Sequence, residues 1–416
     1  MSSELLFTPC GGVPNQSTRA GVLPLQITLH HFRASMLAWL RYGLLLMLFL
    51  VSLTSFAFQS PTVVPALQST KASTSPLTAV TKAGERLVAV GQRGHILISD
   101  DDGFSWRQAS VPVSSDLVAV SFASANHGWA VGHSGVVLKT EDGGLNWMLQ
   151  LDGEQASSLI QDYYQSRIGN EEYPDADLLL EREQVLVGYG GTQPLMDVYF
   201  ADEQNGYVVG IFNRLLKTSD GGVTWEPWAH RIDNPYELHF YSISVGGDGL
   251  YITGEQGMVW RLDEEKLYFD SVPTPYAGTL FGSAVGADRV VAFGMRGSAY
   301  LSTDQGQTWE RLAIDSVAGI TDGVIVEQGA IVLVNLAGEL MVSTDQGQTF
   351  QTQPVTNGMP FYGLAQVSSS QLALVGAEGV QRLAVMTSDP AGGESRVSLF
   401  SADSVVLNSV EHRHVK

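Results

Sequence analysis

The chain has 416 residues, of which 44% are hydrophobic, 16% are charged and 44 are glycine. A disordered chain would carry fewer apolar residues and a higher density of charge, so this composition indicates a turn-rich globular protein. The formal net charge of −20 disfavours nucleic acid and anionic lipid headgroups as partners, because like charges repel. We therefore expect no nucleic-acid partner.

The first 57 residues are expected to be a leader that ends in a secretory signal peptide. Arg41 supplies the positive charge, residues 44–53 form a short apolar core, and residues 55–57 (Ser-Phe-Ala) form a small-x-small cleavage site. We predict cleavage near Ala57 and a periplasmic product that begins near Phe58. An uncleaved membrane anchor is the alternative interpretation.

The start of the chain leaves two further expectations. Met36 is an alternative start to Met1, because it directly precedes the signal-like segment. The single cysteine, Cys10, lies in the leader, so the mature chain would have no disulfide and no thiol nucleophile. Export without disulfides suits a periplasm-like compartment. Without its leader the chain would carry 20 basic and 42 acidic residues, a net charge of −22.

A segment of the form apolar-apolar-Gly-x-x-Gly recurs along the chain with a period of about 41 residues. The seven copies begin at Ala89, Ala130, Val208, Ile252, Ala292, Leu333 and Leu374. One interval is longer than the others by an insertion of about 37 residues, between the second and third copies. Such a regular period is the sequence signature of a repeat architecture.

Five copies continue into an alternating strand and then the sequence Ser/Thr-x-Asp-x-Gly-x-Ser/Thr/Asn followed by an aromatic residue. This is the Asp-box turn, in which Asp accepts hydrogen bonds from backbone N–H groups and Gly supplies a positive φ. The aromatic residue opens the next strand and buries apolar area. We interpret the box as structural. The pairs are Asp101 and Trp106, Asp142 and Trp147, Asp220 and Trp225, Asp304 and Trp309, and Asp345 and Phe350.

Each period holds four short strand-like segments, as at residues 116–122, 128–132, 136–140 and 147–151. Four strands in about 41 residues predict an all-β fold, a seven-bladed β-propeller with Asp-box turns. We place the propeller at residues 76–402, after a linker at 58–75 and before a tail at 403–416. The fourth copy has lost its box, and the seventh keeps only a remnant at 388–393.

The insertion at residues 152–190 departs from the strand pattern. Apolar positions at helical spacing predict one helix over 155–168 and a second over 175–187. The insertion lies in a connection between two blades, and in a propeller such connections share a face with the turns between second and third strands. We expect the insertion and the Gly-x-x-Gly turns to meet on one face near the channel mouth. Packing of the hairpin on the rim, or plugging of the channel, is the alternative.

Seven Gly-x-x-Gly turns combined with Asp boxes behind a signal peptide resemble the photosystem II stability/assembly factor family of Asp-box propellers. The resemblance covers about residues 76–401. It implies a seven-bladed propeller that acts as a scaffold, assembly or stability factor for a membrane protein complex. For members outside photosynthesis, the resemblance also implies an envelope transporter as client. For photosystem members it implies a patch of arginines, from which this strongly acidic chain departs, with Arg93 and Arg296 at the same position of two Gly-x-x-Gly turns.

Asp boxes also occur in sialidases and other glycosidases, so a glycoside hydrolase is one alternative function. A sialidase would need a Phe-Arg-Ile-Pro-type segment near the start, an arginine triad and a Tyr/Glu pair, and the sequence contains no such segment. Glu255 and Glu378, which both lie in Gly-x-x-Gly turns, keep a glycosidase carboxylate pair open. A carbohydrate- or small-ligand-binding propeller is the other alternative. We expect no enzyme activity, no cofactor and no metal, with His412 and His414 in the tail.

The candidate partner face comprises the residues that vary between the conserved glycines of the turns. The surrounding frame is fixed, and the glycines alone do not require charged residues between them. A protein partner on this face, bound by a monomer, is the functional prediction. The candidate residues are Arg93, His133, Glu255, Arg296 and Glu378.

Overall fold

The computed structural model describes residues 39, 41–43, 59–190, 192–326, 330–353, 355–368, 371–384, 387–388 and 394–395. The chain divides into two units, residues 1–59 and 60–416. In the first unit, Trp39 and residues 41–43 are helical. No helix in the described ranges is long and apolar enough to cross a membrane. The expected apolar core, the cleavage site, Cys10, Met36 and the tail at 403–416 lie outside the described residues.

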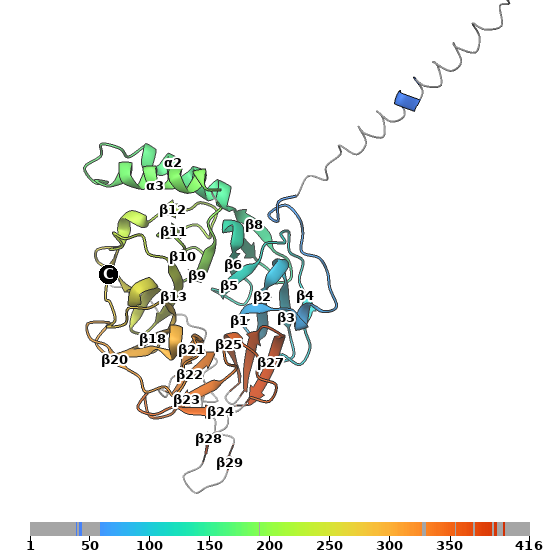
Figure 1. Cartoon of the computed structure of the whole chain (residues 1–416), viewed down its shortest axis with the longest axis vertical. Coiled ribbons are helices and arrows are strands. Elements are labelled where there is room, and N and C mark those ends of the chain that lie inside the picture. The colour runs from blue at the N-terminus through green and yellow to red at the C-terminus, as the bar shows by residue number, and fades with distance from the viewer. Residues whose placement is uncertain are drawn as a thin grey trace, which may run out of the picture. The chain divides into compact units, whose positions relative to one another are not determined.

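The second unit is a ring of seven antiparallel sheets, which confirms the predicted seven-bladed propeller (Figure 1). We number the sheets blades 1 to 7 in chain order. The strands of blades 1 to 4 are β1 (Leu77–Ala83), β2 (Arg86–Gly91), β3 (Ile96–Ser99) and β4 (Arg107–Gln108); β5 (Leu117–Phe122), β6 (Gly128–Gly132), β7 (Val137–Thr140) and β8 (Met148–Leu151); β9 (Leu195–Phe200), β10 (Gly206–Gly210), β11 (Arg214–Thr218) and β12 (Glu226–Pro227); and β13 (Phe240–Gly246), β14 (Gly249–Gly254), β15 (Val259–Asp263) and β16 (Tyr268–Ser271).

Blades 5 and 6 also have four strands, whereas blade 7 has three. Their strands are β17 (Leu280–Val285), β18 (Val290–Gly294), β19 (Ala299–Ser302) and β20 (Glu310–Arg311); β21 (Ile320–Ile325), β22 (Ile331–Asn335), β23 (Leu340–Ser343) and β24 (Gln351–Gln353); and β25 (Phe361–Ser368), β26 (Gln371–Gly376) and β27 (Gly379–Ala384). A further two-stranded sheet pairs β28 (Thr387–Ser388) with β29 (Glu394–Ser395).

Each blade is a simple meander in which consecutive strands are hydrogen-bonded neighbours. The second strand of every blade is buried along almost its whole length, because neighbouring blades cover both of its faces. Every first strand contains a register shift near its start, as between Leu77 and Ala79 in β1. The blades therefore share the same backbone irregularity, a register shift near the start of the first strand, as well as the same strand order.

Apolar side chains from adjacent blades form the core. Trp129 of blade 2 stacks on Phe200 of blade 3, with ring centroids 3.5 Å apart. Trp225 then meets Phe200 edge to face at 6.1 Å. Such aromatic pairs stabilise the blade interfaces beyond the area that they bury.

The five Asp boxes form the same hydrogen-bonded turn. In blade 3, Asp220 accepts the hydroxyl of Thr218 at 2.9 Å and both the amide and the hydroxyl of Thr224, at 2.9 and 2.6 Å. The Gly222 amide donates to the Thr218 hydroxyl at 2.9 Å. The boxes of Asp101, Asp142, Asp304 and Asp345 repeat this set, with an Asn amide replacing the second hydroxyl at Asp142. Their Asp residues therefore satisfy backbone groups within the turn.

The aromatic residues of the boxes pack against the blades, but they differ in burial and in the acceptor that the indole N–H of each tryptophan uses. Trp147 and Trp225 are buried, whereas Trp106, Trp309 and Phe350 are half-buried. The Trp106 and Trp147 indoles donate to the carbonyl of the glycine in their own box. The Trp309 indole instead donates to the Val272 carbonyl of the preceding blade at 3.1 Å.

The ring closes where blade 7 packs on blade 1. Leu77 and Val80 of β1 share one apolar cluster with Ala365 and Val375 of blade 7. Within the described residues, no sheet mixes strands from the two ends of the chain. Closure therefore rests on side-chain packing.

The segment before the first strand lies along blade 1. The Ser114 amide donates to the Pro61 carbonyl at 2.8 Å, and the Ala66 amide donates to the Val111 carbonyl at 3.1 Å. A short helix, η1 (Ala72–Thr74), buries Ala72 between blades 1 and 7 and contacts β27. Residues 60–75 thus extend the packed surface of the ring.

Two helices interrupt the connection between blades 2 and 3: α2 (Gly153–Gln165) and α3 (Ala176–Gly188). The helix α2 begins two residues before the predicted start. The Asp152 carboxylate accepts the Gln155 amide at 2.9 Å while the Gln155 side chain accepts the Asp152 amide at 3.1 Å. This reciprocal cap satisfies two amides at the helix start, which the apolar spacing alone does not reveal.

Candidate docking face

The turns between the second and third strands of the seven blades lie beside the starts of the inner strands. In each blade the first turn residue donates its amide to the carbonyl of the residue before the inner strand, at 2.8 to 3.4 Å. The donors and acceptors pair as Gln92 with Pro76, His133 with Asp116, Ile211 with Pro194, Glu255 with His239, Met295 with Thr279, Leu336 with Gly319 and Ala377 with Pro360. We call the surface made by these seven turns the turn face.

The second residue of five turns adopts a left-handed backbone conformation. Arg93 has φ 57°, Phe212 has φ 56° and Arg296 has φ 58°, and Ser134 and Gln256 share this geometry. A left-handed residue other than glycine costs about 1 kcal/mol or more. Arginine and phenylalanine are therefore kept at positions where the backbone alone would favour glycine or asparagine.

The five predicted residues all lie on the turn face, in two groups of neighbouring blades. Glu378 of blade 7, Arg93 of blade 1 and His133 of blade 2 are exposed on adjacent blades. Glu255 of blade 4 and Arg296 of blade 5 form the other group, and of these Arg296 is exposed and Glu255 half-buried. Among the described residues, neither Arg93 nor Arg296 forms an ion pair.

Glu255 supports the inner strand of its own blade. Its carboxylate accepts the His239 amide at 3.0 Å and lies 3.8 Å from Nδ1 of that histidine. The same Nδ1 accepts the Phe212 amide at 2.9 Å, and the two rings meet edge to face at 4.4 Å. His239 therefore holds the Phe212 turn of blade 3 against blade 4, and Glu255 holds His239.

Sequence reasoning missed the apolar part of the turn face. Phe212, Met295 and Leu336 are 41%, 41% and 42% exposed and stand in the turns of blades 3, 5 and 6. Tyr241 and Phe281 of the inner strands β13 and β17 lie half-buried beside them, with centroids 6.1 Å apart. Phe212, Met295 and Leu336 occupy the same two turn positions as the charged candidate residues. A search of those positions for apolar as well as charged residues would have found them.

The helical hairpin starts at the turn face and then follows the rim. A Cβ on Gly153 would lie 2.8 Å from the Ser134 carbonyl oxygen, so only glycine lets α2 begin this close to the turn of blade 2. Further along, the Tyr163 hydroxyl donates to Glu226 at 2.8 Å, and the Tyr164 hydroxyl lies 3.2 Å from Nδ1 of His230. Both helices run outside β12 (Figure 1). The hairpin thus meets the turn of blade 2 at its first residue, while Leu186 of α3 lines a cavity with Phe212 and Asn213 of the blade 3 turn. The rest of the hairpin packs on the rim.

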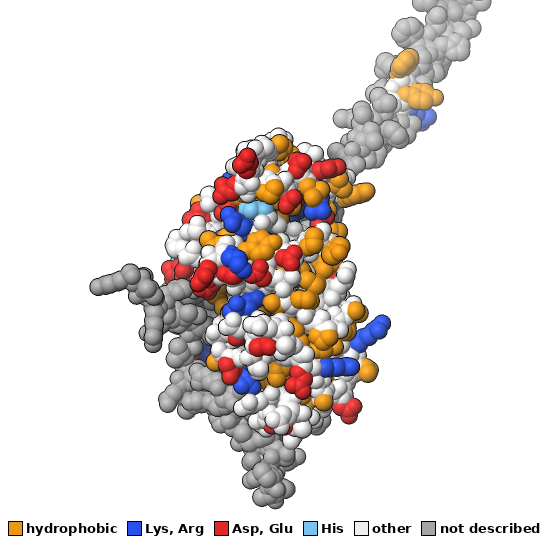
Figure 2. Space-filling view, turned by 90° about the vertical axis from the view of Figure 1, so that its left-hand side faces the viewer, with side chains coloured by type: hydrophobic (Ala, Val, Ile, Leu, Met, Phe, Trp, Pro, Cys, Tyr) orange, Lys and Arg blue, Asp and Glu red, His pale blue; other side chains and the backbone are white. Residues whose placement is uncertain are grey.

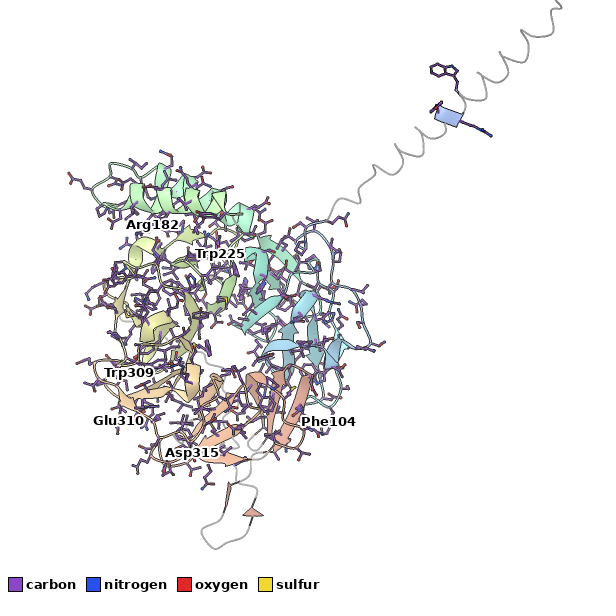
Figure 3. All side chains as sticks on the ribbon, in the orientation of Figure 1. Phe104, Arg182, Trp225, Trp309, Glu310 and Asp315 are labelled. Atoms are coloured by element: carbon purple, nitrogen blue, oxygen red, sulfur yellow. The ribbon has the colours of Figure 1, made fainter. Side chains whose placement is uncertain are left out.

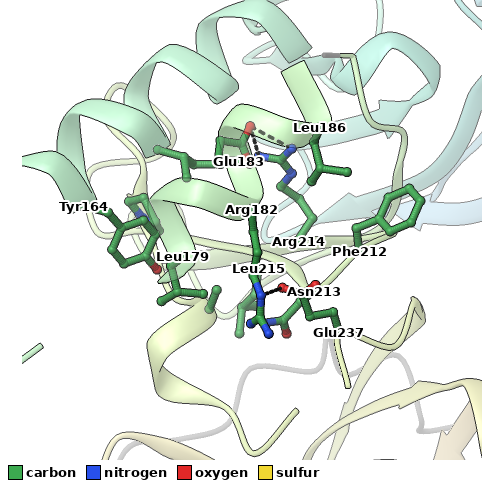
Figure 4. A pocket seen from close by; sticks show the side chains of 13 residues that line it. Tyr164, Leu179, Arg182, Glu183, Leu186, Phe212, Asn213, Arg214, Leu215 and Glu237 are labelled. Carbon is green, nitrogen blue, oxygen red and sulfur yellow. Dashed lines mark hydrogen bonds and ion pairs between the residues drawn. The ribbon is translucent and has the colours of Figure 1, made fainter. Parts of the chain in front are cut away.

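A buried ion pair fixes α3 to blade 3. Glu183 and Arg214 are both buried, and their side chains approach to 3.1 Å (Figure 4). Arg182 pairs with Glu237 at 2.7 Å on the same side of the helix. The cavity between α3 and blade 3 is about 40 Å³, which is large enough for water but too small for a larger ligand. A buried charge without its partner is costly, so this pair specifies where α3 lies.

Two carboxylates connect the inner strands of neighbouring blades. Asp197 of β9 accepts the Ile243 amide of blade 4 at 2.8 Å. Asp322 of β21 accepts the Leu364 amide of blade 7 at the same distance. Burial raises the pKa of Asp197 to about 6 and that of Asp322 to about 7, and the charge of Asp197 contributes to the second shift.

A cleft of about 340 Å³ lies between residues 68–73 and the outer strands of blade 1. Trp106, Arg107 and Gln108 line one side of it. Its volume lies in the range used for small ligands. Among the residues that the structure describes, no group of three His, Cys, Asp or Glu residues is placed to bind a metal ion.

The family model described as "Photosynthesis system II assembly factor YCF48" matches residues 98–166 and 183–335, more than half of the chain. The match omits residues 167–182, which include the loop of the helical hairpin. Its two segments cover all or part of blades 1 to 6.

Among curated proteins, the photosystem II assembly lipoprotein Ycf48 of Synechococcus sp. (strain CC9902) is 30% identical over 138 residues, which cover 30% of this chain and 39% of that protein. The chloroplastic photosystem II stability/assembly factor HCF136 of Oryza sativa subsp. japonica is 22% identical over 147 residues, or 34% of this chain and 35% of that protein. These alignments thus span less than two fifths of the relatives' lengths.

The solved structure named "YCF48 bound to D1 peptide" superposes with a TM-score of 0.57 at 16% identity, and covers 77% of this chain and 96% of that one. YCF48 from Cyanidioschyzon merolae gives a TM-score of 0.56 at 15% identity, and covers 74% of this chain and 95% of that one. At this identity the likeness shows the shared fold. The match to the family model, over more than half of the chain, shows that this chain belongs to the family of photosystem II assembly factors of the Ycf48 type.

Proposed function

We propose that this protein is a non-catalytic, exported scaffold that docks a membrane protein through the turn face during assembly or stabilisation of a complex. The observation that carries the proposal is the turn face itself. Seven turns held by the same backbone hydrogen bond display different side chains, and Arg93, Phe212 and Arg296 stand at left-handed positions. Strained residues kept on a rigid frame are typical of binding sites.

The family supplies the class of client. Its members are named for assembly of a photosystem, and one solved relative is named as bound to a peptide of D1. For this chain we propose a membrane protein complex as client, with an envelope transporter as the first candidate. Export to the periplasm, cleavage near Ala57 and action as a monomer belong to the same proposal.

The chemistry of the carboxylates supports a scaffold over a hydrolase. A general acid or base needs a pKa near the working pH and a free approach to substrate. The hydroxyl and amide of Ser105, with the hydroxyl of Ser99, lower the pKa of Asp101 to about 2. The other box carboxylates are bonded in the same way, and Glu255 is bonded to His239. Asp197 and Asp322, whose pKa values burial raises to about 6 and about 7, each accept a backbone amide of a neighbouring inner strand and so serve the ring.

The test compares recovery of a membrane partner from detergent-solubilised membranes of the host. The parent chain and the double variant Arg93→Glu/Arg296→Glu serve as baits. The control is Arg311→Glu, which makes the same change of charge as each of the two substitutions, on the outer strand of blade 5. We expect the double variant to lose the partner at least tenfold, with the control unchanged, because charge complementarity orients docking.

A second arm separates the turn face from the hairpin. Residues 154–188 are replaced by a short Gly-Ser bridge, and partner recovery is measured again. Recovery by the double variant that equals the parent's, at equal thermal stability, would place the client site elsewhere and end the proposal.

A further inference from the structure

The outer side of α3 is an apolar surface with no partner in the described chain. Leu178, Val185 and Tyr189 are 42%, 51% and 86% exposed. They are seven and eleven residues apart, about two and three helical turns, so they line up along one side of the helix. Ala176, Leu179, Leu180 and Glu183 form the buried side. The helix therefore has two apolar sides, of which the ring uses one.

The insertion around this stripe is strongly acidic. Residues 152–190 contain nine Asp and Glu against two Arg, a net charge of −7 out of −20 for the chain. Both arginines are engaged: Arg182 pairs with Glu237, and Arg167 lies 3.4 Å from the centre of the Tyr163 ring. Asp177 and Glu181, next to the stripe, are exposed and form no ion pair within the described residues. Acidic and apolar side chains accordingly mix at the end of the molecule that carries the hairpin (Figure 2).

We propose that the stripe formed by Leu178, Val185 and Tyr189 is a second docking surface, which binds a basic amphipathic helix of another protein. An apolar stripe bordered by carboxylates matches a helix with an apolar side bordered by lysine or arginine. The buried Glu183–Arg214 pair and the Tyr163–Glu226 hydrogen bond keep the surface in place without the partner. A pre-positioned surface loses less entropy on binding.

Charge decides against the other occupants of an apolar stripe. A membrane surface rich in anionic lipid would repel the acidic border. A second copy of the chain in a symmetric dimer would bring two hairpins of net charge −7 together. The family match leaves out residues 167–182, so Leu178 lies outside the matched part of the chain, while Val185 and Tyr189 lie within it. The stripe is on the inserted element and goes beyond the turn-face function.

The experiment measures binding of a fluorescent Lys/Leu amphipathic peptide of about five helical turns to the full chain. The same residues in scrambled order, and a Glu/Leu peptide, are the comparison ligands. We expect the amphipathic Lys/Leu peptide to bind at least tenfold more tightly than either. Leu178→Ser/Val185→Ser/Tyr189→Ser should weaken binding about tenfold. Val223→Ser/Val317→Ser, which changes exposed valines elsewhere, should leave it unchanged.

A second set of variants tests whether the peptide binds the carboxylates beside the stripe or merely the negative net charge of the whole protein. Asp177→Lys/Glu181→Lys should weaken binding and reduce its salt dependence. Glu310→Lys/Asp315→Lys makes the same change of net charge on the rim of blade 5, away from the helix that carries Arg182 (Figure 3). Equal loss in both charge variants, or full binding by the triple serine variant, would overturn the proposal.

The remaining outcomes name the other occupants. Binding of the parent, but not of the triple serine variant, to vesicles of zwitterionic and anionic lipid would assign the stripe to a membrane. A dimer lost in the triple serine variant would assign it to a second copy. Either result overturns the proposal. Arg93→Glu/Arg296→Glu should bind the peptide like the parent, which keeps this test independent of the turn face.

Discussion

The Asp-box turns and the turns of the turn face belong to the same repeat, yet they are stabilised in different ways. In the boxes, side chains make the hydrogen bonds, as when Asp220 accepts from Thr218 and Thr224. On the turn face, backbone amides donate to backbone carbonyls in all seven blades. A turn built from side-chain bonds must keep its sequence, whereas one built from backbone bonds leaves its side chains free. The repeat therefore stays constant in one set of turns and varies in the other.

The largest expected effect comes from the aromatic residue of a box. Trp225→Ala should lower the free energy of unfolding by about 3–5 kcal/mol, because it removes a buried indole that packs on Phe200. Denaturant unfolding followed by circular dichroism measures this loss. Phe104→Ala changes a 75% exposed aromatic residue in the box of blade 1 and should cost much less (Figure 3). Normal stability of Trp225→Ala together with loss of the membrane partner would make the box a recognition site.

The inner strands also contain hydrogen bonds made by side chains, since the carboxylates of Asp197 and Asp322 join neighbouring blades. A carboxyl whose pKa is higher in the folded chain stabilises the fold fully below its unfolded pKa, and this contribution is lost as pH rises through the folded pKa. For Asp322 the window runs from about pH 4 to about pH 7. The stability of the parent relative to Asp322→Asn should therefore fall by about 2 kcal/mol between pH 5 and pH 8.

The measurement is a pair of denaturant titrations at each pH, for the parent and for Asp322→Asn. The difference between the two chains cancels the contribution of His230 to the pH dependence, because both chains contain this residue. Burial lowers the pKa of His230 to about 4, so its contribution to stability rises with pH, opposite to that of Asp322. Asp315→Asn, at an exposed position, is the control. A difference that does not change with pH would show that the Asp322 carboxyl is already charged in the folded ring.

A smaller effect is expected from the carboxylate of a box. Asp220→Ala should cost about 1 kcal/mol, because the amide and hydroxyl of Thr224 and the hydroxyl of Thr218 lose their acceptor at an exposed turn. Asp220→Asn keeps one acceptor oxygen and should cost less. Thermal melts of the two variants give the order. If both melt like the parent, water replaces the carboxylate in this turn and side-chain bonds do not constrain its sequence.

The smallest effect should come from the turn face. Arg93→Gly and Arg296→Gly remove a left-handed arginine, so they should change stability by no more than about 1 kcal/mol and in the stabilising direction. Their partner recovery should fall. Arg311→Gly, in a strand, is the control and should destabilise slightly. A loss of several kcal/mol in either turn variant would show that the arginine side chain supports the frame.

The sequence predicted the ring because each blade repeats the same short-range rules. Glycine spacing, strand alternation and the box residues are local signals, and seven copies made them unambiguous. The five candidate residues do lie on one face, but their grouping into two sets of blades depends on which blades are neighbours in the ring. Pairings across blades, such as the Phe212 amide with His239, depend on three-dimensional neighbours that the period does not specify.

The helical hairpin was also only partly predictable from the sequence. Apolar spacing predicted its two helices. It could not tell which face of α3 packs on the ring and which is exposed, because both faces are apolar. The buried partner of Glu183 is Arg214, at the start of β11. The equivalent positions of other blades hold residues as different as His95, Val136 and Glu339, so the sequence did not single out this arginine as the partner of a buried charge.

The closure of the ring has a consequence for how such proteins change in evolution. Because β1 and β25 meet through side chains and every sheet is built from consecutive strands, the unit of gene duplication coincides with the unit of structure. A whole blade can be added or removed at the junction of blades 7 and 1 without dividing a sheet between the ends of the chain. A ring sealed by an interleaved strand would have to rebuild that shared sheet at each such step. Changes in blade number are therefore accessible to this architecture by single duplications or deletions of one period.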